Sequence, residues 1–218
     1  MYLGVFGFPG SGEEEVAFLL RSCGLKIGYL TPDENGVVTW RMHHKFLPYE
    51  RVRQRGQDIR HPKGPPMTGG GDNAEPTLDK VIHLMRYPWH AIATAANFDI
   101  ESLELVKRAA EIHPRTPATH LTTWESRVKT LVLAYPKLYD KIRELHPDML
   151  LKVEYVEERW SDVKKLLQVN GEPVFPKRDV VKIAPVDFNV ATQLAGEHTA
   201  SQVEVIARNL YKHVPTLL

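Results

Sequence analysis

The sequence contains a single cysteine, Cys23, among its 218 residues. One cysteine excludes an internal disulfide and a multi-cysteine zinc site, and the ten histidines show no His-Glu-x-x-His spacing. No apolar run approaches the roughly 20 residues of a membrane span, and the N-terminus lacks the basic and apolar segments of a signal peptide. We therefore expect a cytoplasmic protein that binds neither a membrane nor a metal ion.

An excess of charge of either sign is also missing. The 28 Lys and Arg residues nearly balance the 27 Asp and Glu residues, which gives a net charge of +1. This balance argues against a protein that binds nucleic acid through bulk charge. Hydrophobic and charged contents of 43% and 25% are ordinary for a globular protein. We expect one domain that covers residues 1–218, because this length is enough for one full core.

The first 30 residues have the pattern of a strand, a tight loop, a helix and a second strand. Residues 2–8 are an apolar strand, and Pro9-Gly10-Ser11-Gly12 is a turn. Residues 13–24 begin with three glutamates and end at a glycine, which is typical of a helix. Residues 26–30 are again strand-like. Such a βαβ unit predicts a parallel sheet, and a glycine-rich loop before a helix is a common phosphate seat.

A second pattern of this kind lies at residues 81–94. A short apolar strand ends at Arg86, Pro88 suits the first turn of a helix, and Thr94 follows about two turns later. Ligands bind outside the C-terminal ends of strands in open α/β sheets, where a guanidinium can hold phosphate or sulfate. The alternative is that Arg86 pairs with a nearby carboxylate and Thr94 only fills a helix face.

The remaining chain alternates between further elements and polar loops. Residues 51–76 are rich in Gly and Pro and strongly basic, which predicts a long loop and a candidate lid. Pro136 is expected to kink or split the helix that contains it. The other expected strands are residues 37–40 and 149–155, and the other expected helices are residues 100–112, 124–145, 160–167 and 199–214.

Taken together, these segments resemble the sulfotransferases that use 3′-phosphoadenosine 5′-phosphosulfate (PAPS). Four anchors carry the resemblance, namely the loop at residues 7–12, the Arg-x-Pro segment at 81–94, and the segments 139–155 and 160–171. The resemblance implies a three-layer α/β fold of the P-loop NTPase-like type, with a mainly parallel sheet flanked by helices. It also implies transfer of a sulfuryl group from PAPS to a hydroxyl or amine on a small-molecule or glycan acceptor.

The resemblance further implies roles for particular residues. Arg86 and Thr94 would hold the 3′-phosphate, and Lys177 and Arg178 would form a basic loop over it. His44 is the first candidate for the general base, although His43 fits almost as well, and Lys45 is a candidate cation. The residues that would hold the 5′-phosphosulfate are Pro9, Gly10, Ser11, Gly12 and Glu13.

The first loop departs from the family pattern. The family usually has Lys or Arg at the position of Gly10, and threonines at the positions of Glu13 and Glu14. Three explanations for this departure compete. A cation from elsewhere, for example Lys45 or residues 51–63, serves the loop; or the site binds a different ligand; or the chain keeps the fold and has lost transfer activity. We expect the adenosine bisphosphate part to bind better than the sulfuryl end. Replacing Gly10 by Lys and both glutamates by Thr is then expected to tighten donor binding.

Two other classes of protein share parts of this pattern. A P-loop kinase or ATPase needs Gly-x4-Gly-Lys-Ser/Thr, and this chain has Glu13 and Glu14 where Lys and Ser/Thr belong. A non-catalytic protein that binds a nucleotide or another ligand on the same fold is the stronger rival, because the Arg86 motif is intact while the first loop is not.

Overall fold

The computed structural model describes residues 1–41, 78–112, 121–175 and 183–211, together with the backbone of residues 51–54 and 57–60. These residues belong to two compact units, between which the chain passes several times. The sheet unit contains Met1–Gly7, Gly12–Leu84 and Lys141–Lys177, and the helical unit contains Phe8–Ser11, Met85–Asp140 and Arg178–Leu218. Each unit is therefore assembled from segments that are distant in the sequence.

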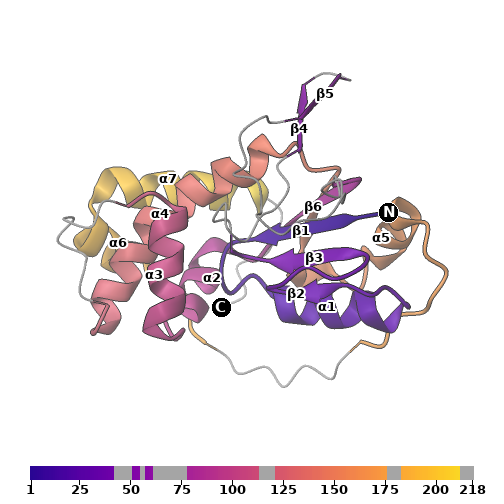
Figure 1. Ribbon diagram of the computed structural model, residues 1–218. Coiled ribbons are helices and arrows are strands. Elements are labelled where there is room, and N and C mark those ends of the chain that lie inside the picture. Colours follow the sequence, from indigo (N-terminus) through magenta and orange to yellow (C-terminus); the bar gives the residue numbers. More distant parts are fainter. Residues whose placement is uncertain (42–50, 55–56, 61–77, 113–120, 176–182, 212–218) are drawn as a thin grey trace. The chain divides into compact units, whose positions relative to one another are not determined.

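The sheet unit is built on a five-stranded sheet with the strand order β2-β3-β1-β6-β7 (Figure 1). Its strands are β1 (Leu3–Gly7), β2 (Gly28–Tyr29), β3 (Gly36–Thr39), β6 (Lys80–Met85) and β7 (Met149–Lys152). Strand β1 runs parallel to β3 on one side and to β6 on the other, where Leu3 lies opposite Lys80 and Gly7 opposite Leu84. The expected α/β structure with a parallel sheet is confirmed, and the strands expected near residues 2–8 and 81–85 are neighbours in it.

One hydrophobic core joins this sheet to α1 (Glu13–Ser22) and α5 (Trp160–Leu167). Strand alternation puts Leu3 and Val5 of β1 on the same face, and both are fully buried in this core. Helix α1 contributes Val16 and Leu20 at helical spacing, and α5 contributes Val163. Figure 1 shows α1 lying along β2 and β3. Burial of each large aliphatic side chain contributes roughly 1.5–3 kcal/mol, so this layer fixes the position of both helices.

The helical unit consists of α2 (Pro88–Ala95), α3 (Ile100–Ala109), most of α4 (Trp124–Glu144), α6 (Phe188–Ala195) and α7 (Glu197–Leu210). Pro88 occupies the first turn of α2, where its missing N–H costs nothing. The Asp99 side chain caps α3 by accepting a hydrogen bond from the Ser102 amide at 2.7 Å. Trp89 of α2 donates from Nε1 to Glu204 Oε2 of α7 at 2.9 Å, which ties these two helices together.

The structure corrects several sequence-based boundaries. Pro136 lies inside α4 without splitting it. The strand expected at residues 149–155 ends at Lys152 and continues as the 3₁₀ helix Val153–Tyr155. The predicted loop at residues 51–76 contains an antiparallel hairpin, β4 (Arg51–Gln54) and β5 (Gln57–Arg60). The high Gly and Pro content of residues 51–76 as a whole predicted a loop, although residues 51–54 and 57–60 form two short strands that pair with each other. Helix α6 was not expected from the sequence.

No helix in the described part of the chain is long and apolar enough to cross a membrane.

Candidate functional site

The chain leaves the sheet at two neighbouring strand ends that carry the residues predicted from the sequence. After β1 the chain builds β2 and β3 on one side of β1, and then β6 and β7 on the other side. The direction of connection therefore reverses between β1 and β6, and such a point is where open parallel sheets bind ligands. Gly7 and Leu84 lie opposite each other in register, so Phe8 and Met85 continue the chain from adjacent ends.

Arg86 and Thr94 lie within reach of each other in the helical unit, as the sequence predicted. Arg86 Nη1 is 3.5 Å from Thr94 Oγ1, which is a loose hydrogen bond. The Thr94 hydroxyl donates to the backbone oxygen of His90 at 2.9 Å, so its position on α2 is fixed. Both side chains are half-buried. Among the described residues, Arg86 makes no ion pair with a carboxylate.

The first loop packs directly on α2, and Gly10 is the residue at which the loop backbone comes close to the helix. Gly10 has a φ of 83°, and a Cβ added to it would lie 2.8 Å from the Ala91 carbonyl oxygen and 3.0 Å from Thr94 Cβ. Phe8 anchors the start of the loop, with its ring centroid 4.5 Å from that of the fully buried Tyr135. The loop that was expected to meet the 5′-phosphosulfate thus lies against the helix that carries Thr94.

This packing explains why position 10 lacks the cation of the family pattern. A lysine at Gly10 requires a left-handed backbone conformation and a displaced α2 backbone, so the position is closed to any side chain. Ser11 remains in the loop as a polar group, and its Oγ is buried without a hydrogen-bond partner in the described part of the chain. Its backbone N–H donates to the Phe8 oxygen at 3.0 Å, which closes the turn.

The start of α1 belongs to the sheet unit and carries negative charge. Gly12 is the N-cap with a φ of 89°, and no side chain caps the helix. A Cβ on Gly12 would lie 2.6 Å from Val153 Cγ2, so the chain after β7 lies against this position. Glu13 is only 3% exposed, whereas Glu14 is exposed. Carboxylates suit a helix N-terminus but compete with an anionic ligand there.

Two residues that the sequence analysis missed belong to the same part of the sheet unit. Tyr29 ends β2, and Arg41 follows β3 by two residues. Burial raises the pKa of the Tyr29 phenol, and the negative charges of Glu13 and Glu14 raise this pKa further, whereas Arg41 lowers it. The charges of Glu13, Glu14 and Arg41 therefore all act on the Tyr29 phenol. The sequence position of Arg41 could have identified it, because a cation that closely follows a parallel strand lies at the C-terminal edge of the sheet, where ligands bind.

Four of the predicted site residues lie outside the described residues. These are the candidate base His44, the candidate cation Lys45 and the basic pair Lys177 and Arg178. Their predicted roles stay predictions.

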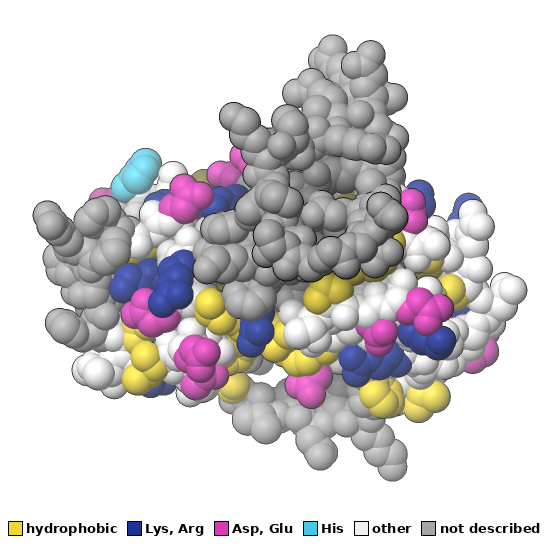
Figure 2. All heavy atoms as spheres, in the orientation of Figure 1, with side chains coloured by type: hydrophobic (Ala, Val, Ile, Leu, Met, Phe, Trp, Pro, Cys, Tyr) yellow, Lys and Arg dark blue, Asp and Glu magenta, His cyan; other side chains and the backbone are white. Residues whose placement is uncertain are grey.

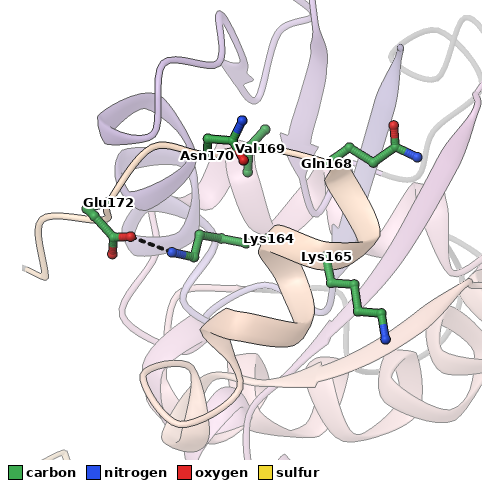
Figure 3. A pocket seen from close by; sticks show the side chains of 6 residues that line it. All are labelled: Lys164, Lys165, Gln168, Val169, Asn170 and Glu172. Atoms are coloured by element: carbon green, nitrogen blue, oxygen red, sulfur yellow. Dashed lines mark hydrogen bonds and ion pairs between the residues drawn. The ribbon is translucent and has the colours of Figure 1, made fainter.

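The described residues also contain a surface cavity, whose lining does not suggest a binding site. An open cavity of about 500 Å³ lies at the C-terminal end of α5, lined by Lys164, Lys165, Gln168, Val169, Asn170 and Glu172. Lys164 reaches to Glu172 in an ion pair of 2.6 Å, while Lys165 and Gln168 point away from this pair (Figure 3). The polar groups that line this cavity therefore do not converge on one ligand. No group of His, Cys, Asp and Glu in the described ranges can hold a metal ion.

The visible surface agrees with the balanced composition. Figure 2 shows basic and acidic side chains interspersed on one face of the molecule.

Comparison with known proteins gives no relative for this chain: no protein-family model, no curated protein and no solved structure matches it.

Proposed function

We propose that this chain is a sulfotransferase-like protein with a P-loop NTPase-like fold, which binds PAPS and transfers its sulfuryl group to a hydroxyl or amine acceptor. The observation that carries the proposal is the group formed by Arg86, Thr94 and the Phe8–Ser11 loop in the helical unit. A guanidinium without a described carboxylate partner, beside a fixed hydroxyl, suits a phosphate monoester. The 3′-phosphate of the donor is such a group.

The proposal places the stronger part of donor binding at the adenosine bisphosphate. Charge-assisted hydrogen bonds from Arg86 contribute about 1.5–3 kcal/mol. In the helical unit, position 10 offers no cation for the sulfuryl end. In the sheet unit, Glu13 and Glu14 put negative charge at the start of α1, where they oppose an anion. A pair of unit charges 4 Å apart is worth about 4 kcal/mol at a surface-like dielectric, enough to offset several loop N–H bonds of about 1 kcal/mol each.

Isothermal titration calorimetry with 3′-phosphoadenosine 5′-phosphate (PAP) tests the proposal. We expect the purified protein to bind PAP, and Arg86→Gln to weaken this binding by roughly 2–3 kcal/mol. Arg108→Gln is the matched control, because it removes the same charge from an exposed position of α3 in the same unit. Wild-type protein that binds no PAP, or equal losses in the two variants, would contradict the proposal.

The rival function is ligand binding without transfer, and one observation favours it. The first loop rests on α2 through Gly10, so the family's cation cannot be restored there without moving the loop. A protein that binds PAP but transfers no sulfuryl group from PAPS to any of a panel of phenol, alcohol and amine acceptors fits this rival. Sulfuryl transfer that is lost in Arg86→Gln supports the enzyme instead.

A further inference from the structure

The sequence contains two Asn-Gly pairs, Asn35-Gly36 and Asn170-Gly171, and both lie in the sheet unit. An asparagine before a glycine is chemically labile, because the glycine has no side chain to shield its backbone nitrogen from the neighbouring carboxamide. That nitrogen attacks the carboxamide carbon, and the asparagine loses ammonia. In a folded protein the reaction requires that the carboxamide turns towards the nitrogen and that the glycine N–H is free of other bonds. The two pairs differ in both respects.

Asn35-Gly36 is held by hydrogen bonds on each reacting group. The Asn35 carboxamide oxygen accepts from the Lys26 N–H at 2.8 Å, and the Gly36 N–H donates to the Asp33 oxygen at 3.0 Å. Gly36 also begins β3 and lies opposite Leu3 of β1, so its backbone is part of the sheet. Ring closure at this pair requires that these bonds break and that the start of β3 leaves the sheet. Asn35-Gly36 is therefore a protected pair.

Asn170-Gly171 follows α5 and lacks these restraints. Within the described part of the chain, no hydrogen bond holds the Asn170 carboxamide or the Gly171 N–H. Asn170 is exposed and is one of the residues that line the cavity beside α5. In Figure 3 the dashed line joins Lys164 to Glu172, and no line reaches Asn170. The carboxamide can therefore turn towards the Gly171 nitrogen without breaking an existing bond.

The chain after this second pair lies close against the end of α1. A Cβ added to Gly171 would lie 2.5 Å from the Cys23 carbonyl oxygen and 2.7 Å from Cys23 Cα, so only a glycine fits there. Three residues later, the Val174 N–H donates to Ser22 Oγ at 3.0 Å. The position of residues 171–174 along α1 is therefore fixed at both ends of this short segment.

We propose that Asn170 is a site of spontaneous deamidation, and that its isoaspartate product loosens residues 171–174 from the end of α1. This inference is independent of the proposed function. In the first step a bond forms from Gly171 N to Asn170 Cγ, and the bond from Cγ to the amide nitrogen breaks. The Gly171 proton leaves with the amide group as ammonia. Water then adds to one of the two carbonyls of the succinimide ring and opens it to aspartate or isoaspartate.

The two products differ in their effect on the contact with α1. Aspartate keeps the backbone and adds one negative charge at an exposed position. Isoaspartate routes the chain through the former side chain, which lengthens the backbone by one carbon before Gly171. The close approach of Gly171 to Cys23 leaves no room for this displacement, so this contact or the bond from Val174 to Ser22 has to give way. Cys23 is 9% exposed and is the one cysteine of the chain, so its thiol reports the change.

Peptide mapping of the wild-type protein tests the site. Trypsin releases the two pairs on separate peptides, residues 27–41 and 166–177, and mass spectrometry measures the replacement of amide by acid in each. We expect the folded protein, kept at mildly alkaline pH, to deamidate at Asn170 at least about tenfold faster than at Asn35, because each hydrogen bond that has to break slows the reaction about fivefold. In guanidinium chloride, which removes the fold, the two rates should agree within about twofold.

Labelling of Cys23 with iodoacetamide tests the effect on α1. Deamidated wild type is compared with Asn170→Gln that has been incubated in the same way, because glutamine has to close a larger ring and reacts far more slowly. We expect molecules with isoaspartate at position 170 to label at least about twofold faster than this variant. Asn170→Asp carries the charge of the product without the longer backbone, and freshly prepared it should label like fresh wild type.

Each contrary outcome decides one part of the proposal. Equal rates at Asn170 and Asn35 in the folded protein, or a faster rate at Asn35, overturn the assignment of the site. A rate difference of the same size in guanidinium chloride assigns it to the local sequence and overturns the protection by β3. Deamidation that leaves Cys23 labelling unchanged, or an equal gain in fresh Asn170→Asp, overturns the effect of isoaspartate on α1.

Discussion

A Cβ on Gly10 would lie 2.8 Å from the carbonyl oxygen of Ala91, so the first loop and α2 touch through their backbones. Real Cβ atoms essentially never approach a heavy atom so closely. The missing loop cation is therefore a consequence of this packing. Gly10→Lys, combined with threonines at positions 13 and 14, was expected from the sequence to tighten donor binding. The contact at Ala91 indicates instead that this lysine would displace the loop.

The contact between Gly10 and α2 predicts a large loss of stability on adding a methyl group. Gly10→Ala combines a left-handed φ of 83° with the clash, and we expect it to lower the free energy of unfolding by roughly 2–4 kcal/mol. Gly196→Ala is the control, because Gly196 has a φ of 87° and nothing lies within 4 Å of an added Cβ. It is expected to cost only about 1–2 kcal/mol. Urea unfolding of both variants checks the prediction, and equal losses would show that backbone conformation alone matters.

The hydroxyl of Thr94 is predicted to support phosphate binding by holding Arg86 in place, because it donates its proton to the His90 oxygen and accepts from the guanidinium. Its oxygen lies 3.5 Å from Arg86 Nη1 and is fixed by its bond to the His90 oxygen. Thr94→Val keeps the shape of the side chain and removes the hydroxyl, so PAP affinity should fall by about 1 kcal/mol, or about fivefold. Thr94→Ser keeps the hydroxyl and should retain the affinity within twofold. Calorimetry of the three proteins checks this, and equal affinities of the Val and Ser variants would exclude a role for the hydroxyl.

His83 predicts a specific loss of stability in acid. It lies on β6 and is 4% exposed, and burial followed by the charge of Arg143 lowers its pKa from 6.5 to about 4. Between these two pH values the unfolded chain binds a proton that the folded chain does not. Stability therefore falls as the pH drops from 6.5 to 4, by about 1.4 kcal/mol per pH unit.

Replacing His83 should remove this part of the pH dependence. We expect the free energy of unfolding of His83→Leu to change less steeply between pH 6.5 and 4 than that of the wild type, whatever its absolute stability. His198→Leu removes an exposed imidazole from α7 and serves as the control. Urea titrations at several pH values check the difference, and identical slopes for His83→Leu and the wild type would contradict it.

The bond between Trp89 and Glu204 predicts different effects for two substitutions at one position. Trp89 is 3% exposed, so loss of its acceptor leaves a buried indole N–H without a partner. Glu204→Ala is expected to cost about 1–3 kcal/mol of stability, while Glu204→Gln keeps an acceptor oxygen and should cost less than half as much. Arg208→Ala breaks the exposed ion pair to Glu204 and should cost under about 1 kcal/mol. Thermal unfolding ranks the three variants, and equal losses for Ala and Gln would show that the indole bond is unimportant.

Local patterns were enough to predict most elements of this fold. The apolar strand before Arg86, the helix start at Pro88 and the helix at residues 160–167 all appear where the sequence placed them. The parallel sheet also followed from the βαβ pattern of the first 30 residues, and β1 indeed runs parallel to β6. The proximity of Arg86 and Thr94 was predictable because a strand end and the second turn of the next helix are joined by only a few residues. These features depend on the spacing of residues that are close in the chain, and this spacing can be read directly from the sequence.

The sequence by itself thus determined an α/β class, a parallel sheet and the local placement of Arg86 beside Thr94. Only the tertiary structure decided that Gly10 is closed to a side chain, since this depends on the approach of the loop to Ala91 of α2. Only the strand order β2-β3-β1-β6-β7 shows that the end of β3 lies beside the end of β1. Both facts arise from contacts between residues far apart in the chain, and no local periodicity or spacing encodes which strand ends meet.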